Sequence, residues 1–218
     1  ALPQQTLLGQ WAEVPPGTFM RGSPPEEFGH SGDEDLAEVT LTRGFLIKVT
    51  EVTQGASVAV FGIEDDELAL LAQTPYIGTP NRWLNIAGID DFDGSGLSSI
   101  ALVETPHIGG TLQFWRWSQG ELTKIAEAPG FSNHKFGSRE QRLSAVEDFD
   151  NDGVSDIAVP SADRKSLRLV KVVDGEVVEI ASVPLPAAID KAIGVTREGD
   201  NVVLTVGLGD GSVYTVHR

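Results

Sequence analysis

The sequence of 218 residues contains no cysteine. Neither a disulfide framework nor a thiolate metal site can therefore form. Long hydrophobic runs are also missing, because glycine, proline or charged residues interrupt every apolar stretch. No segment approaches the ~20 apolar residues that a helix needs to cross a bilayer. The sequence predicts no membrane span.

Basic residues are scarce, since 16 Lys and Arg face 32 Asp and Glu and give a formal net charge of −16. This balance argues against a nucleic-acid partner, because phosphates attract lysine and arginine. Cations are the expected partners. The chain begins at Ala1 without a methionine or an apolar leader, which is consistent with a mature or trimmed product.

An acidic loop at residues 148–156 has the spacing of a calcium site. Carboxylates stand at its positions 1, 3, 5 and 9, and Gly153 at position 6 permits a sharp turn. Calcium takes six to eight hard oxygen ligands. The predicted ligands are four carboxylates and one main-chain carbonyl, those of Asp148, Asp150, Asp152, Asp156 and Val154.

This loop differs from an EF-hand, which requires a glutamate at position 12, where this chain has Val159. The flanking residues are typical of short strands rather than helices. The alternative is an ordinary acidic hairpin turn, because Asp, Asn and Gly are common in turns. Four carboxylates within nine residues repel one another without a cation, which favours metal binding.

A second, weaker loop of this kind begins 57 residues earlier. Serines replace the carboxylates at its positions 5 and 9, which predicts weaker calcium binding; the alternative is a polar turn retained for its shape. The weak site comprises Asp91, Asp93, Ser95, Leu97 and Ser99. In both loops Phe follows the first aspartate and Ile stands at position 10, so both loops are expected to be anchored in a core.

Apolar hairpins recur every 54–55 residues from Gly55 onward, and an Asp-Gly turn joins the last pair of strands. A period near 50 built from short strands predicts an all-β fold, a β-propeller-like array of four-stranded blades. We expect each blade to consist of strand, Asp loop, strand and hairpin. The length allows about three to four blades, possibly forming only part of a ring.

The two Asp loops, DFDNDG and DFDGSG, resemble the FG-GAP/VCBS repeats of calcium-binding β-propellers. The resemblance covers residues 55–218. It implies a secreted or periplasmic protein in which Ca²⁺ has a structural role. The family usually has more blades than this chain can supply, so the alternatives are a small ring, a partial ring that a second chain completes in a homo-oligomer, or an atypical blade built by the N-terminal segment.

Residues 11–54 resemble the opening of a formylglycine-generating-enzyme (sulfatase-modifying-factor) domain, through WAEVPPGTFMRGSP at 11–24 and EVTLTRGF at 38–45. In that family, oxidase activity depends on copper-binding cysteines, which are absent here. We therefore assign no catalytic residue and expect no enzyme. The expected division is a truncated segment at 1–54, possibly contributing strands, and propeller repeats at 55–218.

The four histidines lie far apart, and no catalytic spacing accompanies them. His107 and His134 fall in expected loops and, with Trp83, are candidates for ligand binding. The alternative for the tryptophans is packing between blades. The predicted function is an extracellular binding or adhesion module for a protein or glycan. The alternatives are a carbohydrate-binding lectin and a non-catalytic accessory fragment of a sulfatase-modifying-factor-type protein.

Overall fold

The computed structural model describes residues 11–14, 17–21, 37–41, 45–48, 55–64, 67–199 and 201–218. Contacts divide the chain into two compact units, Ala1–Thr53 and Gln54–Arg218. Strands are the only long regular elements in the described segments, which contain no helix. The prediction of an all-β fold is confirmed. Among these residues no helix is long and apolar enough to span a membrane.

The first unit contains two small antiparallel sheets. One pairs β1 (Trp11–Val14) with β4 (Phe45–Lys48), and the other pairs β2 (Gly17–Arg21) with β3 (Ala37–Leu41). The remaining residues that carry the resemblance to the formylglycine-generating enzyme, at 15–16, 22–24, 42–44 and 51–54, lie outside the described residues.

The second unit contains four antiparallel sheets with consecutive strands side by side. The first is the hairpin β5 (Ala59–Glu64) and β6 (Glu67–Gln73). The second has β7 (Leu84–Asp90), β8 (Ser99–Glu104), β9 (Thr111–Ser118) and β10 (Glu121–Pro129). The third has β11 (Ala145–Glu147), β12 (Asp156–Pro160), β13 (Ser166–Val173) and β14 (Glu176–Pro184). The fourth has β15 (Ile189–Glu198), β16 (Asn201–Leu208) and β17 (Val213–His217).

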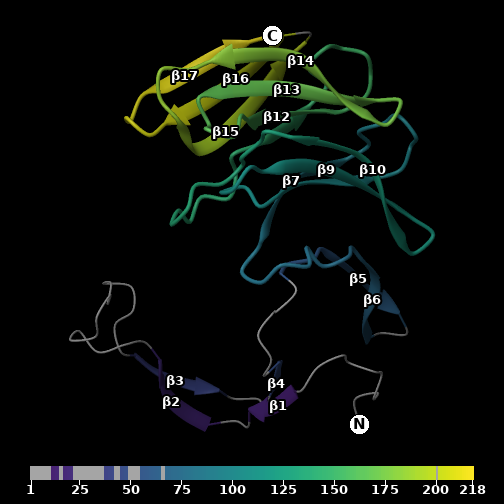
Figure 1. The fold of residues 1–218 in the computed structure, drawn as a ribbon, viewed down its shortest axis with the longest axis vertical. Coiled ribbons are helices and arrows are strands. Elements are labelled where there is room, and N and C mark those ends of the chain that lie inside the picture. The colour runs from purple at the N-terminus through teal and green to yellow at the C-terminus, as the bar shows by residue number, and fades with distance from the viewer. Residues whose placement is uncertain are drawn as a thin grey trace. The chain divides into compact units, whose positions relative to one another are not determined.

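These four sheets stack face to face in chain order (Figure 1). Three apolar clusters fill the spaces between them. Val58 packs with Ile100 and Leu102 in the first space, Phe114 shares the second with Val170, and the third joins the β11–β14 sheet to the β15–β17 sheet. Every residue of β12 is buried because both faces of its sheet are covered.

The pairing of strands supports the expected order of strand, Asp loop, strand and hairpin in both four-stranded sheets. Each of the three hairpins skips one residue on its second strand, at Leu71, Ile125 and Ile180, and these bulges lie 54 and 55 residues apart. Strand β15 was not predicted. None of the described sheets closes into a barrel, so the propeller stays a prediction.

Candidate metal centre

The acidic loop connects β11 to β12, at the edge of the sheet where β11 ends. The main chain of Gly153 has φ of +88°, which is a conformation that glycine adopts without strain. Asp148 shapes the turn, because its carboxylate accepts hydrogen bonds from the backbone N–H groups of Asp152 at 3.1 Å and Gly153 at 2.9 Å. The carboxylate of Asp148 therefore stabilises the turn of the loop.

The loop is anchored in two cores, as its sequence predicts. Phe149 is 1% exposed and packs between the β11–β14 and β15–β17 sheets. Ile157 is fully buried on the other face, against the β7–β10 sheet. A change in the loop is thus transmitted directly to the packing on both sides of its sheet.

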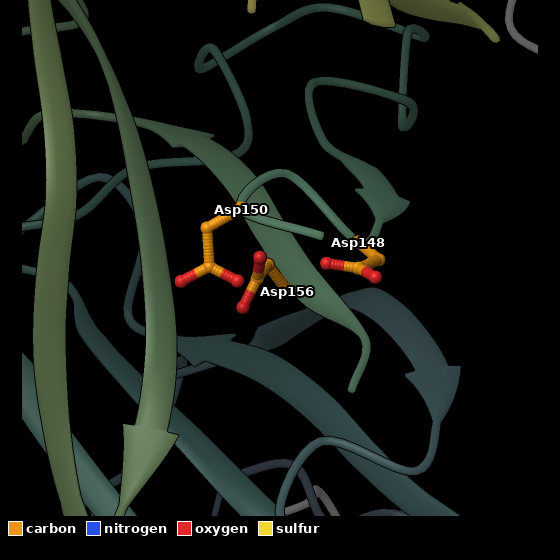
Figure 2. A group of neighbouring side chains, drawn as sticks. All are labelled: Asp148, Asp150 and Asp156. Carbon is orange, nitrogen blue, oxygen red and sulfur yellow. The ribbon is translucent and has the colours of Figure 1, made fainter. Parts of the chain in front are cut away.

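Three carboxylates converge in this loop. Asp148, Asp150 and Asp156 each offer an oxygen, and these oxygens all lie within 4.8 Å of one another. Figure 2 shows Asp156 between the other two. Among the described residues this is the only group of three or more His or acidic side chains close enough to hold a metal ion. The cluster can hold a metal ion.

Asp156 is the buried member of the cluster. Its side chain is fully inaccessible, and its Oδ2 accepts a hydrogen bond from the backbone N–H of Phe149 at 2.8 Å. Burial raises the pKa of Asp156 to about 7, and the charges of Asp150 and Asp152 act in the same direction. Its Oδ1 has no hydrogen-bond partner among the described residues.

One of the two carboxylate oxygens of Asp150 is hydrogen-bonded to a lysine. The Nζ of Lys171 on β13 lies 2.5 Å from Asp150 Oδ2 and 3.0 Å from Asp152 Oδ2. These two bonds raise the pKa of Lys171, and the bond from Lys171 lowers the pKa of Asp152. The other oxygen of Asp150, Oδ1, is buried and has no hydrogen-bond partner in the described part of the chain.

Asp152 and Val154 lie outside the three-carboxylate cluster. Asp152 is exposed, and its Oδ1 accepts a hydrogen bond from the backbone N–H of Val154 at 2.9 Å. Of the five predicted ligands, the structure brings together the carboxylates at positions 1, 3 and 9. The donor set consists of hard carboxylate oxygens, which suits calcium or magnesium rather than a soft metal.

The weaker loop connects β7 to β8 and has the same internal bonds. The carboxylate of Asp91 accepts hydrogen bonds from the backbone N–H groups of Ser95 at 3.1 Å and Gly96 at 2.7 Å. Ser99 at position 9 is fully buried, and its hydroxyl has no partner among the described residues. Leu97 is 40% exposed. The weaker loop therefore has the same shape as the 148–156 loop but fewer carboxylates to bind a cation.

A basic residue on the third strand of each sheet reaches position 3 of its loop. Arg116 Nη2 lies 2.5 Å from Asp93 Oδ2, as Lys171 Nζ does from Asp150. The strand register places both basic residues next to the end of their loop. Arg116 on β9 is the cross-strand partner of Ser99, and Lys171 on β13 directly follows Val170, which is the cross-strand partner of Ile157. These cations were missed from the sequence, because recognising them requires the strand register.

Neighbouring elements clasp the acidic loop. Arg197 on β15 donates from Nη2 to the carbonyl of Asp148 and from Nη1 to the side-chain oxygen of Asn151 at 2.7 Å. The backbone N–H of Ser155 donates to the carbonyl of Asp91 at 3.3 Å, so the two Asp loops are in contact. Adjacent sheets therefore meet at the loops as well as through their apolar faces.

The structure also brings together the three candidate ligand-binding residues. His107 Nε2 lies 2.7 Å from His134 Nδ1, and Trp83 Nε1 donates to His107 Nδ1 at 3.0 Å. They lie on loops at the opposite ends of the strands from the Asp loops. By contrast, Trp115 packs against the cluster between the first two sheets, as expected for an aromatic that fills the space between blades. No family model matches the chain, and a search of curated protein sequences finds no match either.

Proposed function

We propose that the chain is a calcium-binding repeat protein of the FG-GAP/VCBS propeller type, with Ca²⁺ held structurally by the 148–156 loop. It acts outside the cytoplasm, as a secreted or periplasmic binding or adhesion module for a protein or glycan ligand. No catalytic role is assigned to it. By fixing the loop, the ion stabilises the packing of Phe149 and Ile157 on the two faces of their sheet.

One observation carries this proposal: two buried carboxylate oxygens in the cluster, Asp150 Oδ1 and Asp156 Oδ1, have no hydrogen-bond partner among the described residues. Leaving a buried polar atom unpaired costs free energy, and for a carboxylate the cost is larger. Lys171 donates to the Oδ2 atoms of Asp150 and Asp152 and so leaves both orphaned Oδ1 atoms without its charge. A cation that these two orphaned oxygens bind together with Asp148 removes that cost.

Calcium is favoured over magnesium by the ligand geometry. The three carboxylates lie within one short loop; Asp156 is buried, and Asp150 accepts a hydrogen bond from Lys171. They therefore form an irregular set of ligands. Ca²⁺ accepts irregular coordination with water completing the shell, whereas Mg²⁺ demands near-octahedral geometry. The 91–99 loop offers Asp91, Asp93 and the serine oxygens, and we place its calcium affinity well below that of the 148–156 loop.

Thermal unfolding with and without calcium tests the proposal. Binding to the folded state alone stabilises by mass action, so saturating calcium is expected to raise Tm by about 5–10 °C over the protein in EDTA. Asp150→Asn removes most of this increase. The matched change in the weaker loop, Asp93→Asn, keeps most of it. An equal Tm in EDTA and calcium would refute a structural calcium site.

Within the described residues, the sheets at the two ends of the stack have fewer than four strands, which supports an assembly of more than one chain. The β5–β6 sheet has two strands and the β15–β17 sheet has three, whereas the two sheets between them have four. We therefore propose that a second copy completes a propeller ring. Light scattering coupled to size-exclusion chromatography is expected to give a mass above the 23.3 kDa of one chain. A monomer at all concentrations would contradict this assembly.

A further inference from the structure

A cavity of about 420 Å³ lies on the loops opposite the Asp loops. Its wall comes from three places in the chain: the turn before β7, which contains Asn81, Arg82 and Trp83; the loop between β8 and β9, with His107; and the loop between β10 and β11, with Phe136. Its volume falls in the range of small-molecule sites, and three of its seven lining residues are aromatic, namely Trp83, His107 and Phe136.

One chain of hydrogen bonds fixes two of the lining side chains, Trp83 and His107. Trp83 Nε1 can only donate, so Nδ1 of His107 accepts. At the other end, the carbonyl of Ser138 can only accept, so Nε2 of His134, 3.0 Å away, donates to it. Nε2 of His107 must then carry the proton that it shares with Nδ1 of His134. Both rings are neutral in this arrangement.

This chain of bonds uses all the polar atoms of the three rings. The indole N–H and the four imidazole nitrogens are bonded to one another or to Ser138, and none is free for a ligand. What the wall offers is aromatic surface. Trp83 packs on both imidazoles, with ring centroids 4.9 Å and 4.5 Å apart, and these contacts hold the surface rigid.

Phe136 lines the cavity and is 83% exposed, although it contacts His107 with ring centroids 5.5 Å apart. A phenylalanine gains little stability for the fold at such exposure. It gives the cavity a second aromatic surface in addition to that of Trp83. A ligand with an apolar face can contact both Trp83 and Phe136.

The polar groups of the cavity lie on one turn. Arg82 is half-buried, and no hydrogen bond or ion pair of its guanidinium occurs among the described residues, although the chain carries a net charge of −16. Asn81 next to it is exposed. A guanidinium beside an aromatic wall matches a carboxylate, which it binds through two parallel hydrogen bonds.

We propose that this cavity binds a uronic acid unit of an acidic polysaccharide. The sugar ring lays its C–H face on the aromatic wall between Trp83 and Phe136. Its carboxylate pairs with Arg82, and Asn81 takes the ring hydroxyls. A pyranose unites an apolar face with a polar rim, which is the pattern of this cavity. The site is separate from the calcium cluster.

Titration calorimetry with trigalacturonic acid as the probe and galactotriose as its neutral counterpart tests the proposal. We expect the acidic sugar to bind and the neutral one to bind at least about tenfold more weakly, because only the former satisfies Arg82. Arg82→Gln and Phe136→Ala are each expected to lower the affinity for trigalacturonic acid by about tenfold or more. Lys165→Gln, which removes an exposed cation from the loop after β12, leaves binding unchanged.

Two further arms locate the binding. Wild type in EDTA, at a temperature where its melting curve shows it folded, is expected to bind trigalacturonic acid as it does in calcium, because the cavity and the Asp loops lie at opposite ends of the strands. Loss of binding by the folded protein in EDTA would place the sugar on loop-bound calcium and overturn the proposal. Absence of binding to the wild type, equal affinity for galactotriose, or preference for the dipeptide Phe-Asp over the sugar would overturn it too.

Discussion

Lys171 Nζ lies 2.5 Å from Asp150 Oδ2, so a cation of the protein already neutralises one carboxylate of the metal cluster. Arg116 holds the same place beside Asp93 in the weaker loop. Each loop thus has a basic residue that compensates its charge when metal is absent. In the stronger loop this compensation is incomplete, because Asp150 Oδ1 and Asp156 Oδ1 stay unpaired among the described residues. Lysine and calcium are therefore expected to compete.

Replacing Lys171 by methionine tests this competition. The methionine keeps the apolar stem and removes the charge, so Lys171→Met is expected to raise calcium affinity by roughly tenfold, the order expected for one nearby charge. The variant also melts lower than wild type in EDTA, because the carboxylates then repel one another without compensation. Calorimetric titration and melting curves measure the two effects.

The control is Lys124→Met, which breaks the more exposed pair with Glu127, away from the Asp loop, and is expected to change neither quantity appreciably. If Lys171 is a permanent replacement for the metal, Lys171→Met will lose stability in EDTA and calcium will not restore it. That result would contradict a calcium site in this loop.

Asp156 gives the metal-free protein a distinctive pH dependence. Its pKa is about 7 in the folded state because of burial, against an ordinary value of 3.8. The folded state therefore holds a proton that the unfolded state has released, and this contribution to stability is lost as pH rises from about 4 to about 7. Asp156→Asn removes the dependence. Urea unfolding in EDTA of wild type and variant, at pH 5.5 and pH 8, measures it as a difference between the two proteins.

The same group predicts proton release on calcium binding. A metal ligand must be deprotonated, so calcium displaces the proton of Asp156, and affinity falls as pH drops below about 7. Calorimetry in two buffers of different ionisation enthalpy counts the released protons near pH 6.5. An uptake of protons, or no pH dependence, would show that Asp156 is not a ligand.

Local patterns in the sequence were sufficient to predict much of this fold. The recurrence of paired apolar runs located three hairpins and an Asp-Gly turn located the last one, and Phe149 and Ile157 are buried as their loop positions indicated. Strand β15 escaped because Lys191, Gly194 and Thr196 interrupt its apolar pattern. Its pairing with β16, which is a contact between segments, gives it its strand geometry.

The candidate site was predictable only in its local part. Position-specific spacing identified Asp148, Asp150 and Asp156, because a turn of nine residues fixes its own geometry. Lys171 and Arg197 come from strands that begin well after the loop ends, and the register that brings them to it depends on tertiary packing. The contact of His107 with His134, 27 residues apart, is of the same kind.

Gly110 is expected to be indispensable for packing between the second and third sheets. A Cβ added to this buried residue would lie 2.0 Å from the backbone oxygen of Phe131, which cannot move without displacing its strand neighbours. Gly110→Ala should therefore destabilise the fold by about 2–3 kcal/mol or more. Gly194→Ala is the matched control, because its added Cβ meets nothing closer than 4.0 Å. Equal urea midpoints for the two variants would contradict this account.

Acid should disrupt the hydrogen-bonded pair of histidines. Burial lowers the pKa of both His107 and His134, and the charge of the nearby Arg164 acts in the same direction on both. The folded state therefore resists protonation while the unfolded state accepts it, so stability is lost as pH falls below about 6.5. The Trp83–His107–His134–Ser138 chain accommodates no additional proton, because every nitrogen already has its donor or acceptor role.

Nitrogen-15 NMR of the imidazole rings measures this directly. At pH 8 both rings are expected as the Nε2–H tautomer, because Trp83 donates to Nδ1 of His107 and Ser138 accepts from Nε2 of His134. On acidification the two rings should protonate below the ordinary histidine range, together with loss of the Trp83 hydrogen bond. Trp83→Phe removes the donor that fixes the tautomer of His107 and is expected to yield a mixture of its tautomers. A Nδ1–H tautomer of either ring in the wild type at pH 8 would disprove the proposed chain of donors.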